Sequence, residues 1–247
     1  MRFCLTLQLK ERFLTVEYRR IILSFIKNAL TKYDNGKYYE DFFKDTKQKD
    51  YCFSVILPKP IFTNDKVIID KNEIKIIFSM KSNLEMTFIL FNAFIEQINK
   101  QYPLPNNNLM VLKNINKEKQ QEIINSKVIF RTAVGSGICV RNHDKEKNTD
   151  TYYVYNDKEF REKIKVVLSN QLLNSGFTEE EVNEVNINPI QCKKVVVKHY
   201  KRYIDTSVGL FEIKANNKIL QHLYEVGVGS RKSMGFGLMD LVTQDLL

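Results

Sequence analysis

The residues best suited to chemistry gather near the C-terminus, in the stretch GVGSRKSMGFG (residues 227–237). Two glycine pairs bracket an insert that carries two hydroxyl groups and two cationic side chains. Glycine lets a backbone approach a ligand closely, and consecutive amide groups can form a concave site for an anion. This combination predicts contact with a phosphate backbone. The predicted contact residues are Gly227, Gly229, Ser230, Arg231, Lys232, Ser233, Gly235 and Gly237.

Two nucleotide-binding motifs share features with this stretch but do not fit it. A dinucleotide fingerprint needs a strand before it and a helix and a strand after it, and only ten residues follow Gly237. A P-loop ends in Gly-Lys-Ser or Gly-Lys-Thr, which is missing here. The remaining alternative is a ligand-free turn whose glycines serve a helix cap and a bulge.

A second cationic cluster lies in the segment CKKVVVKHYKRYID, which we predict to be one strand. The alternation of a strand would place Lys194, Lys198 and Arg202 on one face, with His199 and Lys201 on the other. Such a basic and aromatic strand could bind RNA by phosphate contact and stacking. Alternatively, the lysines could protect an edge strand from aggregation.

The charge balance of the whole chain agrees with an anionic partner. The 247 residues include 38 Lys and Arg against 29 Asp and Glu, a formal net charge of +9, and 43% are apolar. The apolar fraction predicts a globular protein, and the cationic excess favours nucleic acid or an acidic surface. A base-biased genome, which enriches lysine, is the alternative explanation of this composition.

The remaining composition argues against several other classes of protein. Four scattered cysteines form no CxxC pair, and three histidines show no HxxxH or HExxH spacing, so we expect no metal and no cofactor. We expect His143 to be a solvated loop residue and His222 to be packed. No apolar run is long enough to span a membrane. We therefore expect reduced cysteines and a cytoplasmic protein.

The elements that must position these residues follow a simple order. The first half predicts strand, helix, strand, strand, helix, strand, which is the ferredoxin-like arrangement. MRFCLTLQL alternates as a strand, and Arg19, Arg20 and Lys27 fall toward the polar faces of the helix after it. We predict residues 66–80 to be a hairpin that turns at Lys71-Asn72.

The second half uses the same elements more loosely. We expect an α+β protein of two tandem ferredoxin-like (RRM-like) domains, with the glycine-rich loop near the C-terminus. The polar segment NKEKQQEIINSK (residues 116–127) is the expected junction. The predicted domains are residues 1–120 and 121–247.

In these features the chain resembles the CRISPR-associated RAMP endoribonucleases that process precursor CRISPR RNA. GVGSRKSMGFG fits that family's G-h-G-x5-G-h-G loop (h, apolar) just before the last strand. MRFCLTLQL resembles its first strand, SFIKNAL its first helix, and YCFSVIL the strand after its catalytic loop. The resemblance covers about 60 N-terminal and 50 C-terminal residues.

The resemblance implies tandem ferredoxin-like domains and metal-independent cleavage of CRISPR repeat RNA. In that chemistry a ribose 2′-hydroxyl attacks the phosphorus and leaves a 2′,3′-cyclic phosphate and a 5′-hydroxyl. A base, an acid and cations that stabilise the phosphorane are needed. The implied partners are repeat RNA and a CRISPR effector complex, and the protein would be a monomer or a homodimer.

The catalytic residues depart from the family's pattern. Its usual histidine falls at Phe43 or Lys44, so the loop has no imidazole; the lysine falls at Lys49 and the helix tyrosine at Lys27. By the resemblance, Lys27 and Lys49 would stabilise the phosphorane, with one as proton donor, and Tyr39 would orient the attacking hydroxyl. The candidate catalytic residues are therefore Lys27, Lys44, Lys49 and Tyr39.

Each of these candidates also has a structural interpretation. Lys27 could be a solvated residue on a helix, Lys49 a solvated loop residue, and Tyr39 a packing residue. Arg19 and Arg20 on the first helix are further RNA-binding candidates. The missing histidine leaves a second hypothesis, a non-catalytic paralogue that holds repeat RNA or an effector complex. A generic basic RNA or protein adaptor is a third.

Overall fold

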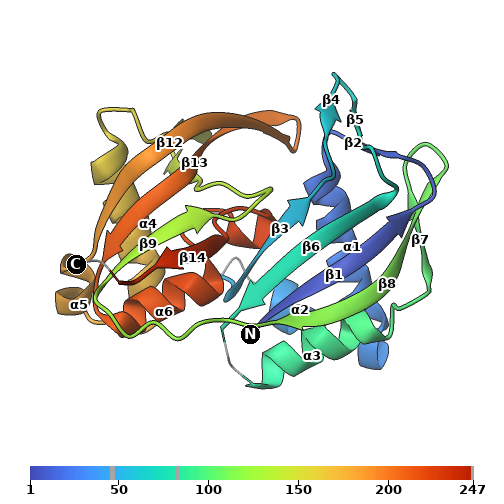
Figure 1. The fold of residues 1–247 in the computed structure, drawn as a ribbon, viewed down its shortest axis with the longest axis horizontal. Coiled ribbons are helices and arrows are strands. Elements are labelled where there is room, and N and C mark those ends of the chain that lie inside the picture. The colour runs from blue at the N-terminus through green and yellow to red at the C-terminus, as the bar shows by residue number, and fades with distance from the viewer. Residues whose placement is uncertain (45–47, 82–83, 246–247) are drawn as a thin grey trace.

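The two halves of the chain form two α+β units that lie side by side (Figure 1). The structure is a computed structural model and describes residues 1–44, 48–81 and 84–245. With the added small elements left out, the core of each unit has the strand–helix–strand–strand–helix–strand order and a sheet with the strand order of a ferredoxin-like domain. The expected fold of two tandem ferredoxin-like domains is therefore confirmed.

The N-terminal unit is built on a five-stranded antiparallel sheet in the order β3-β6-β1-β8-β7. Beside it lies a small three-stranded sheet in the order β2-β5-β4. The strands are β1 (Arg2–Leu9), β2 (Phe13–Thr15), β3 (Tyr51–Ile56), β4 (Ile61–Phe62), β5 (Lys66–Ile68), β6 (Glu73–Met80), β7 (Gln101–Leu104) and β8 (Asn108–Glu118). The helices are α1 (Tyr18–Lys32), the 3-10 turn η1 (Tyr33–Gly36), α2 (Tyr39–Phe43) and α3 (Leu84–Ile95).

The C-terminal unit is built on a four-stranded antiparallel sheet in the order β12-β13-β9-β14. A separate two-stranded hairpin, β10-β11, is inserted before its first helix. The strands are β9 (Lys127–Thr132), β10 (Val140–Asp144), β11 (Thr149–Tyr153), β12 (Asn186–His199), β13 (Arg202–Lys214) and β14 (Met239–Thr243). The helices are α4 (Phe160–Leu173), α5 (Glu179–Asn183), α6 (Asn217–Val226) and the 3-10 turn η2 (Lys232–Met234).

Apolar side chains of α1 and α3 bury one face of the first sheet. Phe3, Leu5, Leu7 and Leu9 of β1 are almost completely buried there, which confirms the predicted alternation of this strand. The opposite face of β1 is also covered, because Arg2 and Cys4 contact the C-terminal unit. The sheet is therefore packed on both faces near the junction of the two units.

The contact between the units combines a small apolar cluster with directed polar bonds. The guanidinium of Arg2 pairs with Asp240 at 2.8 Å and donates to the Met239 carbonyl at 2.6 Å. The Ser79 hydroxyl donates to the Glu225 carbonyl at 2.7 Å. These contacts hold the C-terminal end of α6 and the first residues of β14 against the N-terminal sheet, and the glycine-rich loop lies between those two elements in the chain.

The predicted hairpin at residues 66–80 is wrong. β5 pairs with β2 and β4 in the small sheet, whereas β6 pairs with β1 and β3 in the large one. Lys71-Asn72 therefore links two sheets, which a single-sequence pattern does not distinguish from a tight turn. Within the described part of the chain, no helix is long and apolar enough to cross a membrane.

Candidate nucleic-acid interface

The glycine-rich loop is shaped by its contacts with the protein's own backbone. All four of its glycines have positive φ angles, between 74° and 93°. A Cβ atom at Gly237 would lie 2.3 Å from the Val228 carbonyl oxygen, and one at Gly229 would lie 2.7 Å from the Cys139 carbonyl oxygen. These glycines are therefore needed to close the loop, and the side chains offered to a ligand belong to the insert between them.

Arg19 connects this loop to the N-terminal unit and does not lie on a polar face. It is 6% exposed, and its guanidinium donates to the carbonyls of Gly235 at 3.3 Å and Gly135 at 2.8 Å. The expectation that Arg19 lies on a polar face of the helix is wrong, because its side chain is buried between the two units. Arg20 does stay at the surface, where it pairs with Glu17 at 2.8 Å.

A cleft of about 560 Å³ lies between the two units, next to the glycine-rich loop. It brings together candidate residues that are about 200 positions apart in the sequence. From the N-terminal unit the lining includes Lys27, Lys49 and Tyr51; from the loop it includes Ser230, Arg231, Lys232 and Ser233; and from elsewhere it includes Arg141, Gln171 and Tyr200. The cleft is therefore lined by four cationic side chains from the two ends of the chain and by a fifth, Arg141, from the middle.

The two lysines on the N-terminal side of the cleft are half-buried. Lys27 projects from α1, and its ammonium lies 5.0 Å from the centre of the Phe43 ring. Lys49 precedes β3, the strand that places Tyr51 in the same wall. Their shared position is compatible with stabilising one developing negative charge, and their catalytic role stays a prediction.

Lys44 and Tyr39 lie elsewhere. Lys44 is exposed and pairs with Glu40 at 2.6 Å, and the hydrogen bond to Glu40 raises the pKa of this lysine. Tyr39 is partly buried, with its ring 5.3 Å from that of Phe43. Neither is among the described residues that line the cleft, so the structure offers their candidate roles no supporting contact.

Lys232 occupies an unusual position for a lysine. Its side chain is 5% exposed, and its amine has no hydrogen-bond partner among the described residues. Burial lowers the pKa of Lys232 to about 8, although the nearby Cys52 and Asp50 act in the opposite direction. The RNA contact predicted for Lys232 stays a prediction, and η2 turns its side chain into the wall of the cleft.

Two residues that sequence reasoning missed support this loop. Tyr51 is buried with its hydroxyl next to Ser233, and burial raises the pKa of the phenol. The Gln171 amide donates to the Gly227 carbonyl at 2.7 Å and accepts from the Gly229 amide at 3.2 Å. Gln171 falls on the apolar stripe of α4, and a polar residue in such a stripe is a sequence signal for a buried structural bond.

The predicted basic strand is interrupted by a turn. β12 ends at His199 and β13 begins at Arg202, with Tyr200 and Lys201 between them at positive φ angles. Lys198 and Arg202 are therefore on different strands, and the predicted shared face is wrong. The tip of the hairpin contacts the N-terminal unit, because the Lys201 amide donates to the Glu17 carboxylate at 2.5 Å. Lys194 pairs with Asp205 at 2.6 Å.

His199 is buried behind this tip. It is 1% exposed, its ring meets those of Tyr200 and Phe236 edge to face, and neither ring nitrogen has a described hydrogen-bond partner. Burial, helped by the charges of Arg19 and Arg231, lowers the pKa of His199 to about 4. The imidazole is buried and neutral near pH 7, and the RNA contact expected of His199 stays a prediction.

Two linked ferredoxin-like units with a basic, glycine-rich loop between them are the architecture of the RAMP class of CRISPR-associated proteins. The family model described as CRISPR associated protein Cas6, C-terminal, matches residues 116–241. This match covers just over half of the chain, which therefore belongs to the Cas6 family. The resemblance inferred from the glycine-rich loop is thus confirmed.

Solved structures agree with this fold over nearly the whole chain. A structure titled "An RAMP protein binding different RNA substrates" has a TM-score of 0.80 at 20% identity and covers 98% of this chain and 100% of its own. A Cas6-related protein from Pyrococcus furiosus has a TM-score of 0.82 at 19% identity and covers 99% of both chains. A structure titled "CRISPR associated protein Cas6" has a TM-score of 0.72 at 17% identity, with 98% and 99% coverage. A search of curated proteins found no match.

Proposed function

We propose that this protein is a metal-independent endoribonuclease that cleaves CRISPR repeat RNA. The observation that carries the proposal is the cleft in which Lys27 and Lys49 face the insert of the glycine-rich loop. Membership of the Cas6 family gives the class of substrate, precursor CRISPR RNA. The cationic lining gives the means of holding a phosphodiester and of stabilising extra charge on it.

The proposed reaction is an internal transfer of the phosphoryl group. The 2′ oxygen forms a bond to phosphorus while the bond to the 5′ oxygen breaks, which gives a 2′,3′-cyclic phosphate and a 5′-hydroxyl. The 2′-hydroxyl loses its proton to a base, and the leaving 5′ oxygen gains one from an acid. Lys27 and Lys49 stabilise the phosphorane, and one of them donates the proton to the 5′ oxygen.

The other parts of the cleft would bind and orient the RNA. Ser230 and Ser233 carry hydroxyl groups that can donate to phosphate oxygens, and Arg231 adds a cation beside them. The proposed reaction needs no cofactor. We also propose that the protein works in the cytoplasm, as a monomer or a homodimer, and delivers processed RNA to an effector complex.

A second candidate is a non-catalytic subunit that holds repeat RNA. It is favoured by one observation: none of the described residues lining the cleft is a histidine. Imidazole is the side chain best matched to proton transfer near neutral pH, so its absence leaves the cleft with binding groups and less obvious acid–base groups.

Incubation of the purified protein with labelled repeat RNA in excess EDTA distinguishes the two candidates. We expect cleavage at one position, with a cyclic phosphate on the upstream product, and no cleavage of an unrelated hairpin. Tight binding of repeat RNA that stays intact would reject the nuclease and support the holding subunit. Equal binding of both RNAs would favour a general adaptor.

A further inference from the structure

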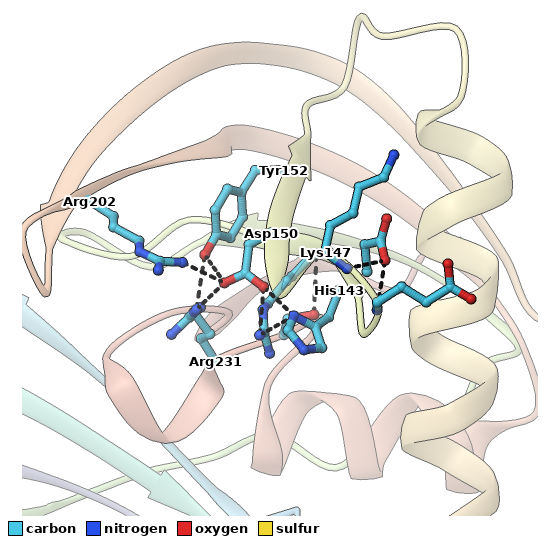
Figure 2. A network of polar contacts seen from close by, with 10 residues as sticks. His143, Lys147, Asp150, Tyr152, Arg202 and Arg231 are labelled. Carbon is cyan, nitrogen blue, oxygen red and sulfur yellow. Dashed lines mark hydrogen bonds and ion pairs between the residues drawn. The ribbon is translucent and has the colours of Figure 1, made fainter.

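A network of cationic side chains converges on a single carboxylate in the C-terminal unit (Figure 2). Asp150 accepts hydrogen bonds from Arg141 at 2.6 Å and from Arg231 at 3.0 Å, and the Tyr152 hydroxyl lies at 3.2 Å. The ring of His143 lies at 2.8 Å, and the Arg202 guanidinium at 3.8 Å. Each oxygen of this carboxylate therefore has at least two neighbours, which leaves it little capacity for another donor.

The inserted hairpin β10-β11 presents this network on one of its faces. Arg141 pairs across the hairpin with Tyr152, and His143 pairs with Asp150. Because these positions alternate along each strand, the four side chains share a face. His143 is exposed, as expected, but its expected place in a loop is wrong, since it lies on β10 beside Asp150.

Two further elements bring their arginines to this face. Arg231 comes from the glycine-rich loop, where it adopts a left-handed backbone conformation with φ of 58°. Arg202 begins β13, immediately after the tip of the long hairpin. The network thus joins the loop, the inserted hairpin and the β12-β13 tip, which contribute Arg231, Arg141 and Tyr200 to the lining of the cleft.

The charges of the network do not balance. Three guanidinium groups surround one carboxylate, which leaves an excess of two positive charges before His143 is counted. Burial alone would raise the pKa of Asp150, but the hydrogen bonds and charges of Arg141 and its neighbours lower it overall. Asp150 therefore stays ionised, and the unmatched charge belongs to the arginines.

The acid is buried and the cations reach the surface. The side chain of Asp150 is 5% exposed, whereas that of Arg202 is 63% exposed. Arg141 and Arg231 also line the cleft that holds Lys27 and Lys49. Their Nε atoms are buried and have no described hydrogen-bond partner, so neither guanidinium has all its donors satisfied. The buried Nε atoms cannot reach a ligand in the solvent, but the exposed guanidinium of Arg202 and the cleft-lining side chains of Arg141 and Arg231 are open to one more anion.

We propose that Arg141, Arg202 and Arg231 form a binding site for one RNA phosphate at the edge of the cleft, with Asp150 as the positioning residue that orients them. The identity of the ligand as RNA rests on the proposed function. Planar guanidinium groups that are already held in place bind a phosphate with less loss of side-chain entropy than free lysines. The site would hold the RNA away from the reacting phosphodiester and fix its register in the cleft.

The first test substitutes the most exposed arginine, Arg202→Ala, because this change is the least disturbing to folding. Binding is measured with repeat RNA that carries 2′-deoxyribose at the mapped cleavage position, so that no cleavage occurs. We expect about tenfold weaker binding and a salt dependence reduced by about 0.7 in the slope of log K against log salt, the value for one contact to a single strand. Arg161→Ala, another exposed arginine of the C-terminal unit, is the matched control and should change neither quantity.

Single methylphosphonate linkages, moved along the RNA, identify the phosphate concerned. One position should weaken binding by the wild-type protein about as much as Arg202→Ala does, and it should add little further loss in that variant. Full additivity at every position would show that Arg202 contacts no single phosphate and would overturn the proposal.

The second test removes one negative charge with Asp150→Asn and measures whether RNA binding becomes tighter or weaker. A general electrostatic surface would bind RNA more tightly when a negative charge is removed. A positioning carboxylate predicts the opposite, about fivefold or more weaker binding despite the added positive charge, with an unchanged circular dichroism spectrum. Tighter binding by a folded variant would contradict the positioning role. If Asp150→Asn does not fold, the Arg202 measurements decide the proposal.

The outcomes separate this site from the proposed function. If the wild-type protein neither cleaves nor prefers repeat RNA, the proposed function fails, and the same variants are then measured with an unrelated single-stranded RNA of equal length. A loss confined to Arg202→Ala and Asp150→Asn would keep the phosphate site. Cleavage of repeat RNA with wild-type binding by Arg202→Ala would reject the site and leave the nuclease.

Discussion

The two walls of the cleft carry positive charge in different ways. On the C-terminal wall, Arg141 and Arg231 are held by Asp150 in ion pairs of 2.6 and 3.0 Å. On the N-terminal wall the cations are lysines, and the ammonium of Lys27 lies 5.0 Å from the centre of an aromatic ring. Arginine stays protonated and presents a fixed planar fork, whereas a lysine can lose its proton when its surroundings disfavour charge.

This difference suggests a division of work across the cleft. Fixed arginines suit a phosphate that must be held in one place throughout the reaction. Lysines suit a phosphate that gains charge in the transition state and a leaving oxygen that needs a proton. The glycine-rich loop carries Arg231 on the C-terminal wall, and the close backbone packing at its glycines fixes the position from which Arg231 reaches Asp150.

Lys49→Ala is expected to have the largest effect on activity. If the N-terminal wall performs the chemistry, single-turnover cleavage should fall by about 10²- to 10³-fold, because one stabilising charge or proton donor is lost. Binding of uncleavable RNA should change less than threefold. Rapid-quench kinetics and equilibrium binding measure the two quantities.

Lys113→Ala is the matched control, since Lys113 is an exposed lysine on β8 outside the cleft lining. It should cleave at the wild-type rate. If Lys49→Ala instead loses binding and cleavage in equal proportion, the lysine wall is a second holding surface and the contrast between the walls disappears.

Gly237→Ala should cause the next largest effect, and on stability. The added methyl would meet the Val228 carbonyl oxygen at 2.3 Å, in a backbone with φ of 74°. Strain and steric overlap together should lower the free energy of unfolding by about 3 kcal/mol or more. Denaturant titration followed by circular dichroism measures this loss.

Gly176→Ala provides a sharp control for this change. Gly176 also has a positive φ, 90°, but a methyl there would meet nothing within 4 Å. It should cost only about 1 kcal/mol, from backbone strain alone. Equal losses at Gly176 and Gly237 would show that close packing of the loop contributes nothing and that only its φ angles matter.

Much of the fold was predictable because local patterns determine it. The alternation of β1, the apolar face of α1 and the closing strand β14 after the glycine-rich loop were all predicted correctly. The pairing of β5 was not, because the choice between two sheets depends on contacts with β2 and β4 that no short window contains. The domain boundary at residue 120 stays a prediction.

The site was harder to predict because its polar residues are buried by the contact between the units. Arg19, His199 and Lys232 have polar side chains that are seldom fully buried, and the sequence analysis predicted that all three contact RNA. The structure buries all three around the glycine-rich loop. The Asp150 network was missed because its arginines come from three separate segments and its carboxylate has no motif.

Lys232 lies in the cleft lining together with Arg141 and Arg231, and Lys232→Met tests whether this lysine takes part in the chemistry. Its effect should be the smallest of the predicted effects. A buried amine without a partner is costly to keep charged, so the substitution should raise the free energy of unfolding by about 1–2 kcal/mol at pH 7. The folded protein has a pKa of about 8 at Lys232, below the ordinary value of 10.5. Between these values the unfolded chain binds more protons than the folded one, so the stability of the wild type should rise with pH.

The difference in stability between wild type and Lys232→Met should therefore shrink as the pH rises from 7 to 10, because groups common to both proteins cancel. Urea unfolding at three pH values measures it, and Lys113→Met is the control that should show no such trend. A more stable variant that binds RNA normally but cleaves slowly would assign Lys232 to the chemistry together with the lysine wall. A variant that is less stable than the wild type at pH 7 would show instead that the Lys232 amine has favourable contacts in its buried position and does not destabilise the folded protein.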